Sequence, residues 1–279
     1  MKEIFFNDVA NQLNCGYLFC IPFQFKSAQQ GTVMRFSSQL QQAVQLGTFV
    51  KTPHPHIIEV LALANLDFLI LDAEHSPYDR ATLDLCIMTA RLSGLPTLVR
   101  IPDAEPSTIL NALDCGATGI QVPHVCTAEQ AEQIVKRSHY GENGRGYAGS
   151  TRAANYATKP MAEHLSTSQA TTTVVAQIED PAGVDNVEAI AAVDGIDALF
   201  IGQVDLAVAY GAPSVQADIV REASLKVIAA AKKYNKPVGM FVADASQISD
   251  WKEAGVSFFG LASEHKMIID GFNRQRAAL

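Results

Sequence analysis

Short and almost continuously apolar runs recur along the chain from residue 47 onward. Eight of them have the length and the β-branched or aromatic content of strands: residues 47–51, 68–75, 96–102, 118–125, 172–180, 197–205, 237–244 and 257–263. Continuous apolar runs, as opposed to alternating ones, are typical of parallel strands that are buried on both faces. The pattern therefore predicts a parallel sheet.

Helical segments lie between these runs, for example at residues 79–94, 127–140 and 216–235. Several of them end at Gly or Asn with Pro shortly after, as in SGLP and YNKP, which is a common helix stop. Eight strands with interleaved helices predict an α/β fold, a TIM (β/α)8 barrel. The first strand is not followed by a GxGxxG motif, which disfavours an open dinucleotide-binding sheet.

Two segments do not follow this rhythm. Residues 1–33 match no strand–helix unit, whereas the stretch after Met34 has the pattern of a short lead-in helix. We therefore predict a dispensable N-terminal extension, 1–33, and a barrel domain, 34–279. Residues 141–170 form a long polar connection between the fourth and fifth strands, which suggests a functional or mobile segment, or a solvated surface excursion.

Composition narrows the class of protein. The length of 279 residues, 48% of them hydrophobic, suits one barrel better than two domains. A net charge of -8 disfavours nucleic acid as a partner, and no apolar run approaches the ~20 residues that span a bilayer. The five cysteines form no CxxC pair and no signal peptide is recognisable, so we expect a reduced, cytoplasmic protein.

Polar residues stand at the ends of five of the apolar runs, where barrel enzymes carry their active sites. They are Asp72, Glu74 and His75, then Arg100, His124, Gln177 and Glu179, and finally Gln203 and Asp205. Polar groups at the tips of apolar strands are costly to desolvate without a partner or a ligand. Their concentration on five strands favours an active site over a structural network.

Glu179 and Asp205 follow adjacent strands, so their carboxylates could converge on one cation. Oxygen ligands of this kind suit Mg2+ or Mn2+. The structural alternative is that each carboxylate caps the helix that follows it, where negative charge is favoured.

Asp72 and His75 are three residues apart, a spacing that allows the carboxylate to orient the imidazole of a general base. A hydrogen-bonded structural histidine is the alternative. Arg100 ends the apolar run TLVR and should face an anion, for which a salt bridge to Glu74 or Asp72 is the structural alternative.

His54 and His56, in KTPHPHI, form an HxH motif after the first strand, a metal signature of amidohydrolase barrels. Here Pro separates the two histidines and the helix starts at once. The last strand offers only Ser263 and Glu264 in place of the Asp that such barrels need. A hydrolase built on this motif is therefore a minor alternative.

The motifs together resemble a known family. LILDAEHSP, TLVRIP, LDCGATGIQVPHVCTAEQA, GRGYAGSTRAANY, VAQIED and FIGQVDL occur in order from Gly47 to the C-terminus. This set is similar to the class II pyruvate aldolases, which include 4-hydroxy-2-oxoheptanedioate aldolase and 2-dehydro-3-deoxyglucarate aldolase. The resemblance implies a barrel of the phosphoenolpyruvate/pyruvate-binding type. It also implies cleavage of a 4-hydroxy-2-oxo acid to pyruvate and an aldehyde; a non-catalytic relative that only binds a 2-oxo acid is a further alternative.

The resemblance also implies site roles. A divalent ion (Mg2+ or Mn2+, with Co2+ or Zn2+ possible) would be held by Glu179 and Asp205. Arg100 would stabilise the enolate oxygen of pyruvate, and His75, oriented by Asp72, would move the proton.

Further positions follow from the same resemblance. Gln177 would lie beside the metal, and Gln203 and Val204 would line the substrate site together with Asp205. Asp114 matches an acidic residue that the family inserts into a neighbouring subunit's site, which implies a homo-oligomer, a hexamer in the family.

The sequence departs from the family pattern near the substrate mouth. Gln203 and Ala207 stand where the family has Pro and Ser, and the stretch VPHVCT brings in His124 and Cys126. These departures leave the aldehyde specificity open.

Overall fold

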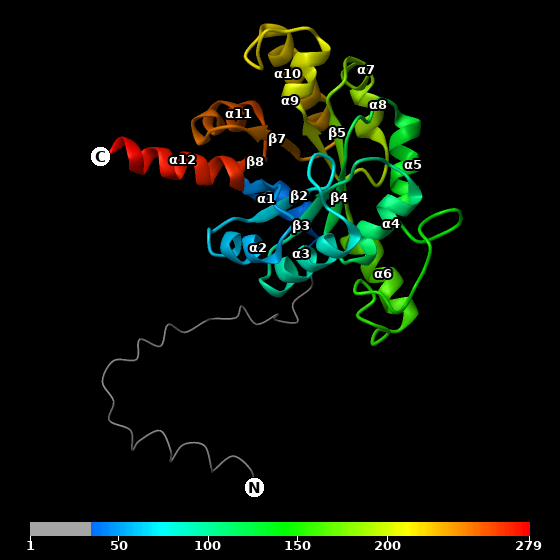
Figure 1. The fold of residues 1–279 in the computed structure, drawn as a ribbon. Helices are drawn as coiled ribbons and strands as arrows, with labels where there is room; N and C mark the ends of the chain where they lie inside the picture. Colours follow the sequence, from blue (N-terminus) through cyan, green and yellow to red (C-terminus); the bar gives the residue numbers. More distant parts are fainter. Residues whose placement is uncertain (1–34) are drawn as a thin grey trace, which may run out of the picture. The chain divides into compact units, whose positions relative to one another are not determined.

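Eight parallel strands close into a barrel in sequential order, which confirms the predicted TIM (β/α)8 fold (Figure 1). The computed structural model describes residues 35–279; the predicted extension, residues 1–33, lies outside them. The strands are β1 (Gln45–Val50), β2 (Phe68–Asp72), β3 (Thr97–Arg100), β4 (Gly119–Val122), β5 (Thr173–Ile178), β6 (Ala198–Ile201), β7 (Val238–Val242) and β8 (Phe258–Ser263).

Helices follow every strand and cover the outside of the barrel. They are α1 (Phe36–Gln42), α2 (Pro55–Ala62), α3 (Arg80–Leu92), α4 (Pro106–Asp114), α5 (Ala128–Ser138), α6 (Met161–Thr171), α7 (Pro181–Asp185), α8 (Val187–Ala192), α9 (Gln203–Ala209), α10 (Asp218–Lys233), α11 (Ile248–Ala254) and α12 (Glu264–Ala277). The predicted helices correspond to α3, α5 and α10, and the lead-in helix is α1. A short 3-10 helix, η1 (Ala245–Gln247), precedes α11.

Most strands are shorter than the apolar runs that predicted them, and two of these differences concern the predicted site residues. The run 68–75 ends as a strand at Asp72, and the run 197–205 ends as a strand at Ile201. Gln203 and Asp205 therefore lie on the first turn of α9 and not on a strand. Residue 202 is glycine because a Cβ there would lie 2.6 Å from a carboxylate oxygen of Glu179.

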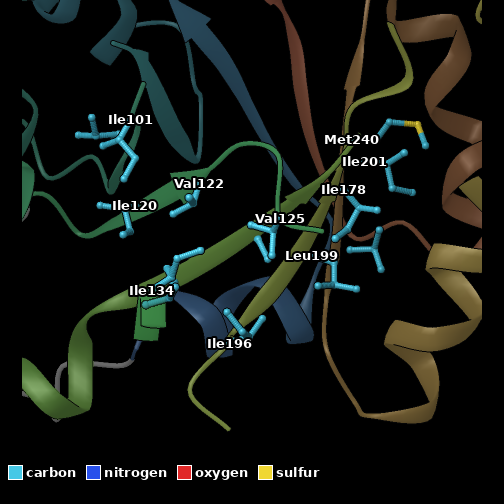
Figure 2. Close-up of a cluster of buried hydrophobic side chains, with 14 of the residues drawn as sticks. Ile101, Ile120, Val122, Val125, Ile134, Ile178, Ile196, Leu199, Ile201 and Met240 are labelled. Atoms are coloured by element: carbon cyan, nitrogen blue, oxygen red, sulfur yellow. The ribbon is translucent and has the colours of Figure 1, made fainter. Parts of the chain in front are cut away.

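The main core lies between the barrel and its helices. Residues on the outward faces of neighbouring strands, such as Ile120, Ile178 and Leu199, pack with Ile134 of α5 in a continuous apolar layer (Figure 2). Each is at most 3% exposed. This layer holds the strands rigidly and so fixes the residues at their ends.

A second apolar cluster fills the amino-terminal half of the barrel interior. Phe68 and Phe258 open strands β2 and β8, and the α1 residues Phe36 and Leu40 pack against this layer. The ring centroids of Phe36 and Phe68 are 5.5 Å apart. Arg35, which precedes α1, holds this helix in place: its Nη2 lies 2.8 Å from Oδ2 of Asp197, which precedes β6. Helix α1 therefore closes the amino-terminal end of the barrel.

The predicted long connection at residues 141–170 is partly helical, because α6 begins at Met161. Its remaining part is bound to the outer helices by two ion pairs, Arg145 with Asp114 at 3.0 Å and Arg152 with Asp84 at 2.5 Å. It follows the C-terminus of α5, so it begins near the amino-terminal end of the barrel. The start of the connection therefore does not cover the carboxyl ends of β4 and β5.

In the part of the chain that the structure describes, no helix combines the length and apolar character needed to cross a membrane. Within the same residues, Cys86, Cys115 and Cys126 are free thiols. The first two are buried, as structural cysteines usually are.

Candidate active site

A cavity of about 390 Å³ opens at the carboxyl ends of the strands. It is lined by six residues that the sequence predicted for the site: His75, Arg100, Gln177, Gln203, Val204 and Asp205. Another cavity, of about 490 Å³, lies between the loop after β3 and α5 and contains only His124 of the strand-end polar residues. The predicted site residues therefore gather at the mouth of the barrel and not at the second cavity.

Asp72 is the most deeply buried charge at this mouth, with no exposed surface. Its Oδ1 accepts from Nε of Arg100 at 3.0 Å, and its Oδ2 accepts from Nζ of Lys51 at 2.6 Å. Burial alone would raise the pKa of Asp72, but the guanidinium and the ammonium hold it below its usual value. Asp72 is thus a fixed negative charge between two cations.

The predicted contact between the Asp72 carboxylate and the His75 imidazole is wrong. Oδ1 of Asp72 accepts from the backbone N–H of His75 at 3.2 Å, and the acidic group near the ring is Glu74, 3.7 Å from Nε2. The imidazole is 58% exposed. A fully buried carboxylate is stabilised more by the two cations, Lys51 and Arg100, than by one exposed imidazole, which accounts for the difference.

Both interpretations of Arg100, a salt bridge to a carboxylate and a place facing the substrate site, agree with the structure. Its guanidinium pairs with Asp72, lies 3.3 Å from Glu74, and stacks 4.9 Å from the ring centroid of Phe49. It also lines the cavity. These contacts hold the planar fork in one orientation, so its remaining N–H groups are available to an anion in the cavity.

Glu179 is only 2% exposed and is held by neighbouring donors. Its Oε1 accepts from the backbone N–H of His124 at 2.9 Å, and its Oε2 accepts from the amide of Gln177. Burial, together with the charge of Asp205, raises the pKa of Glu179 to about 7. Glu179 does not cap the next helix, because Asp180 occupies the N-cap position of α7.

Asp205 lies in the first turn of α9 and lines the cavity. The structural alternative, a carboxylate placed at the start of the following helix, therefore holds for Asp205 but not for Glu179. The two carboxylates nevertheless influence each other, since the charge of Asp205 raises the pKa of Glu179. A divalent cation between such groups would offset both the burial and the repulsion.

Ligands beyond these two carboxylates would have to come from elsewhere. Among residues 35–279, no group of three or more His, Cys, Asp or Glu side chains could hold a metal ion. Water and substrate oxygens would complete the shell, as is usual for Mg2+.

Among the unpredicted residues, two contact the predicted charged or amide side chains. Gln121, with no exposed surface, donates its amide to the side chain of Gln177, which in turn donates to Glu179. Lys51 follows β1 and lines the cavity. A single polar residue inside the apolar run TGIQVP, and a lysine ending the run GTFVK, were the signals available.

Asp114, unlike the other predicted residues, does not lie at the carboxyl end of a strand. It ends α4, is 7% exposed, and forms its ion pair with Arg145. Because α4 follows β3, its C-terminus points toward the amino-terminal end of the barrel. Asp114 does not line the cavity of its own chain.

The HxH motif has a local structural role. His54 is the N-cap of α2, and its ring nitrogen accepts from the backbone N–H of His56 at 3.3 Å. Both side chains are exposed. Neither histidine lines the cavity that Asp205 lines.

Comparison with known proteins agrees with this geometry. The family model described as HpcH/HpaI aldolase/citrate lyase matches residues 45–271. The 5-keto-4-deoxy-D-glucarate aldolase of Klebsiella pneumoniae is 39% identical over 226 residues, 79% of this chain and 86% of that protein.

Solved structures are similar throughout the barrel. The structure of an HpcH/HpaI aldolase/citrate lyase family protein from Burkholderia cenocepacia superposes with a TM-score of 0.83 at 29% identity, over 87% of this chain and 98% of that one. The HpcH/HpaI aldolase of Desulfitobacterium hafniense gives a TM-score of 0.82 at 27% identity, over 88% and 96%.

Proposed function

Because the chain belongs to the HpcH/HpaI aldolase/citrate lyase family, we propose that it is a metal-dependent aldolase acting on a 4-hydroxy-2-oxo acid. The products would be pyruvate and an aldehyde, and the reaction could also run toward synthesis. The family resemblance inferred from the sequence motifs is confirmed, and membership identifies a carbon–carbon lyase. One observation carries the proposal: a fixed guanidinium, Arg100, and the Asp205 carboxylate line one cavity, and the buried Glu179 lies near enough to Asp205 for that charge to raise its pKa.

Each side chain has a task that suits its position. Arg100 offers N–H groups to the oxygen on which charge develops as the pyruvate enolate forms. His75, exposed at the rim, exchanges a proton with C3 of pyruvate through water. Gln203 and Val204 line the wall where the aldehyde half would lie.

Glu179 and Asp205 are the residues that would hold the divalent ion, Mg2+ or Mn2+, with Co2+ or Zn2+ able to replace it. The ion would supply Lewis-acid polarisation of the ketone. The raised pKa of Glu179 supports this assignment, because a buried carboxylate beside a second carboxylate is costly without a cation. The amide of Gln177 holds Glu179 in place, and Gln121 in turn holds Gln177.

The assignment is tested by removing and restoring the metal. A chelator should abolish cleavage of a 4-hydroxy-2-oxo acid, and Mg2+ or Mn2+ should restore it, while circular dichroism stays unchanged. Ion binding, measured by calorimetry, should disappear in Glu179→Ala. Full cleavage activity in the chelated protein or in Glu179→Ala would contradict the assignment.

The alternatives find no support. A hydrolase that uses His54 and His56 would need their rings directed to a shared ion, whereas His54 caps α2. A protein that only binds a 2-oxo acid is disfavoured, because relatives that match most of this chain are named as aldolases.

We further propose a homo-oligomer, a hexamer as in the family resemblance. Helix α12 runs out from the barrel toward the C-terminus (Figure 1). It exposes Met267, Ile268, Ile269 and Phe272 by 40–75%, an apolar surface that suits contact with another subunit.

Asp114 would act across this assembly, in the site of a neighbouring subunit. Mixing inactive Asp114→Ala with inactive Glu179→Ala subunits should restore part of the activity, because some sites would receive both native residues. The absence of recovery after verified subunit exchange would contradict the role of Asp114. Each inactive variant incubated alone is the control. Action in the cytoplasm remains a prediction from the free cysteines.

A further inference from the structure

Lys51 is a charged residue of the cavity wall that has no task in the reaction proposed above. It follows directly after Val50, whose register partner on β2 is Leu71, so it lies beside Asp72. Its side chain is 31% exposed and lines the cavity together with Arg100. A lysine here adds a second cation next to a buried carboxylate that already has one.

The two cations bind different oxygens of Asp72. Nζ of Lys51 lies 2.6 Å from Oδ2, whereas Nε and Nη2 of Arg100 lie 3.0 and 2.9 Å from Oδ1. The carboxylate is fully buried, so no water competes for either oxygen. Lys51 and Arg100 are therefore linked through one carboxylate.

We propose that Lys51 is a positioning residue, which acts through Asp72 to hold the guanidinium of Arg100 in its orientation toward the cavity. Arginine and a carboxylate prefer a pairing in which two N–H groups meet two oxygens. By keeping Oδ2, Lys51 prevents this pairing and leaves both contacts of Arg100 on Oδ1. Without Lys51, the carboxylate would turn both oxygens toward Arg100 and shift the guanidinium with it.

Lys233 provides a matched contrast. It lies in the last turn of α10, outside the cavity lining, and its ammonium pairs with a carboxylate oxygen of Glu188 at 2.6 Å. Its side chain is 56% exposed. Exposed pairs of this kind contribute little, so Lys233 tests whether the loss of any paired lysine would have the same effect.

The inference rests on the proposed aldolase function, and a double-mutant cycle tests it. The rate of C3 proton exchange of pyruvate in D2O would be followed by NMR for metal-loaded wild type, Lys51→Met, Arg100→Lys and the double variant. Lys51→Met should slow exchange by about 10–100-fold, because small displacements of a catalytic group are costly, with KM for pyruvate nearly unchanged. Lys233→Met should change the rate by less than about twofold.

The double variant decides between two roles. If Lys51 acts through Asp72 on Arg100, Lys51→Met should slow exchange by less than about threefold when Arg100→Lys is already present. Effects that multiply would show that Lys51 contacts the substrate independently and would overturn the proposal, as would an unchanged rate in Lys51→Met. Lys51→Arg, which keeps the charge, should restore most of the rate; equal loss in it would also contradict the proposal.

Folding is controlled by measuring all variants well below the lowest of their melting temperatures. If Lys51→Met does not fold, Lys51→Gln takes its place in the cycle. An absence of exchange in the metal-loaded wild type would contradict the aldolase assignment itself. Exchange in the wild type with multiplying effects would leave that assignment intact and reject only the role of Lys51.

Discussion

The two ends of the barrel interior differ in what they bury. At the amino-terminal end, the rings of Phe36, Phe68 and Phe258 pack together under α1. At the carboxyl end, the strand ends bury Asp72, Arg100 and Glu179, each at most 9% exposed. One end is packed with apolar groups, whereas the other has buried charges beside a cavity.

This difference separates stability from function. Burying aromatic rings stabilises the fold by roughly 1.5–3 kcal/mol per side chain. Burying charges costs free energy unless they are paired, and paired charges are at best about neutral compared with apolar residues. A chain that keeps charges at one end of a rigid barrel therefore retains them for binding or chemistry.

The largest expected effect on activity comes from neutralising a buried carboxylate, Glu179, at the carboxyl end of the barrel. Glu179→Gln should reduce aldol cleavage by at least about 10²–10³-fold, since it removes a ligand charge for the ion. The free energy of unfolding of the metal-free protein should stay equal or increase, because burial no longer opposes a charge there. Chemical denaturation and cleavage assays check both. Glu132→Gln, an exposed position on α5, is the control for the substitution type.

A change at the amino-terminal end should have the opposite profile. Phe36→Ala should lower the free energy of unfolding by about 3–5 kcal/mol, because it empties a packed site under the barrel. Its cleavage rate, measured where the protein is folded, should stay within about twofold of wild type. Leu92→Ala, at a side chain 73% exposed, should change stability by less than about 0.5 kcal/mol. A large loss of activity in folded Phe36→Ala would contradict the view that the amino-terminal end serves stability and the carboxyl end serves function.

The smallest expected effect is a pH dependence of stability from His139, which is 8% exposed and follows α5. Burial, with the charges of Arg35 and Arg145, lowers its pKa below the ordinary value of 6.5. The unfolded chain then binds the proton more readily, so this residue makes stability fall as the pH drops below 6.5. Thermal melts of wild type and His139→Gln between pH 5 and about 7.5 compare the slopes. An identical slope in His139→Gln would exclude this contribution.

Much of the fold could be predicted because its signal is local. Continuous apolar runs marked all eight strands, and each run lies at the strand it predicted. The residue at which each strand ends was less certain, because an apolar run does not show where strand pairing stops. The run 197–205 passes without a break into α9, whose Leu206 is as buried as the strand.

The candidate site could be predicted only in part because partner choice is a property of the folded chain. Arg100 and Glu179 were identified by their places at strand ends. The pair of Arg100 with Asp72 was among the alternatives, but the second partner of Asp72 was not found. Spacing suggested the ring of His75, whereas Lys51, 21 residues away, takes one oxygen. Competition of this kind depends on register between strands and does not appear in spacing.

Proton exchange at C3 of pyruvate tests the central claim most directly, because it needs the enolate but no aldehyde. Metal-loaded wild type in D2O should exchange these protons, and the chelated protein should not. Arg100→Lys should exchange them about 10²–10³-fold more slowly while still binding the ion, because it replaces a fixed fork by a flexible point charge. No exchange in the metal-loaded wild type, or equal rates in wild type and Arg100→Lys, would contradict the account.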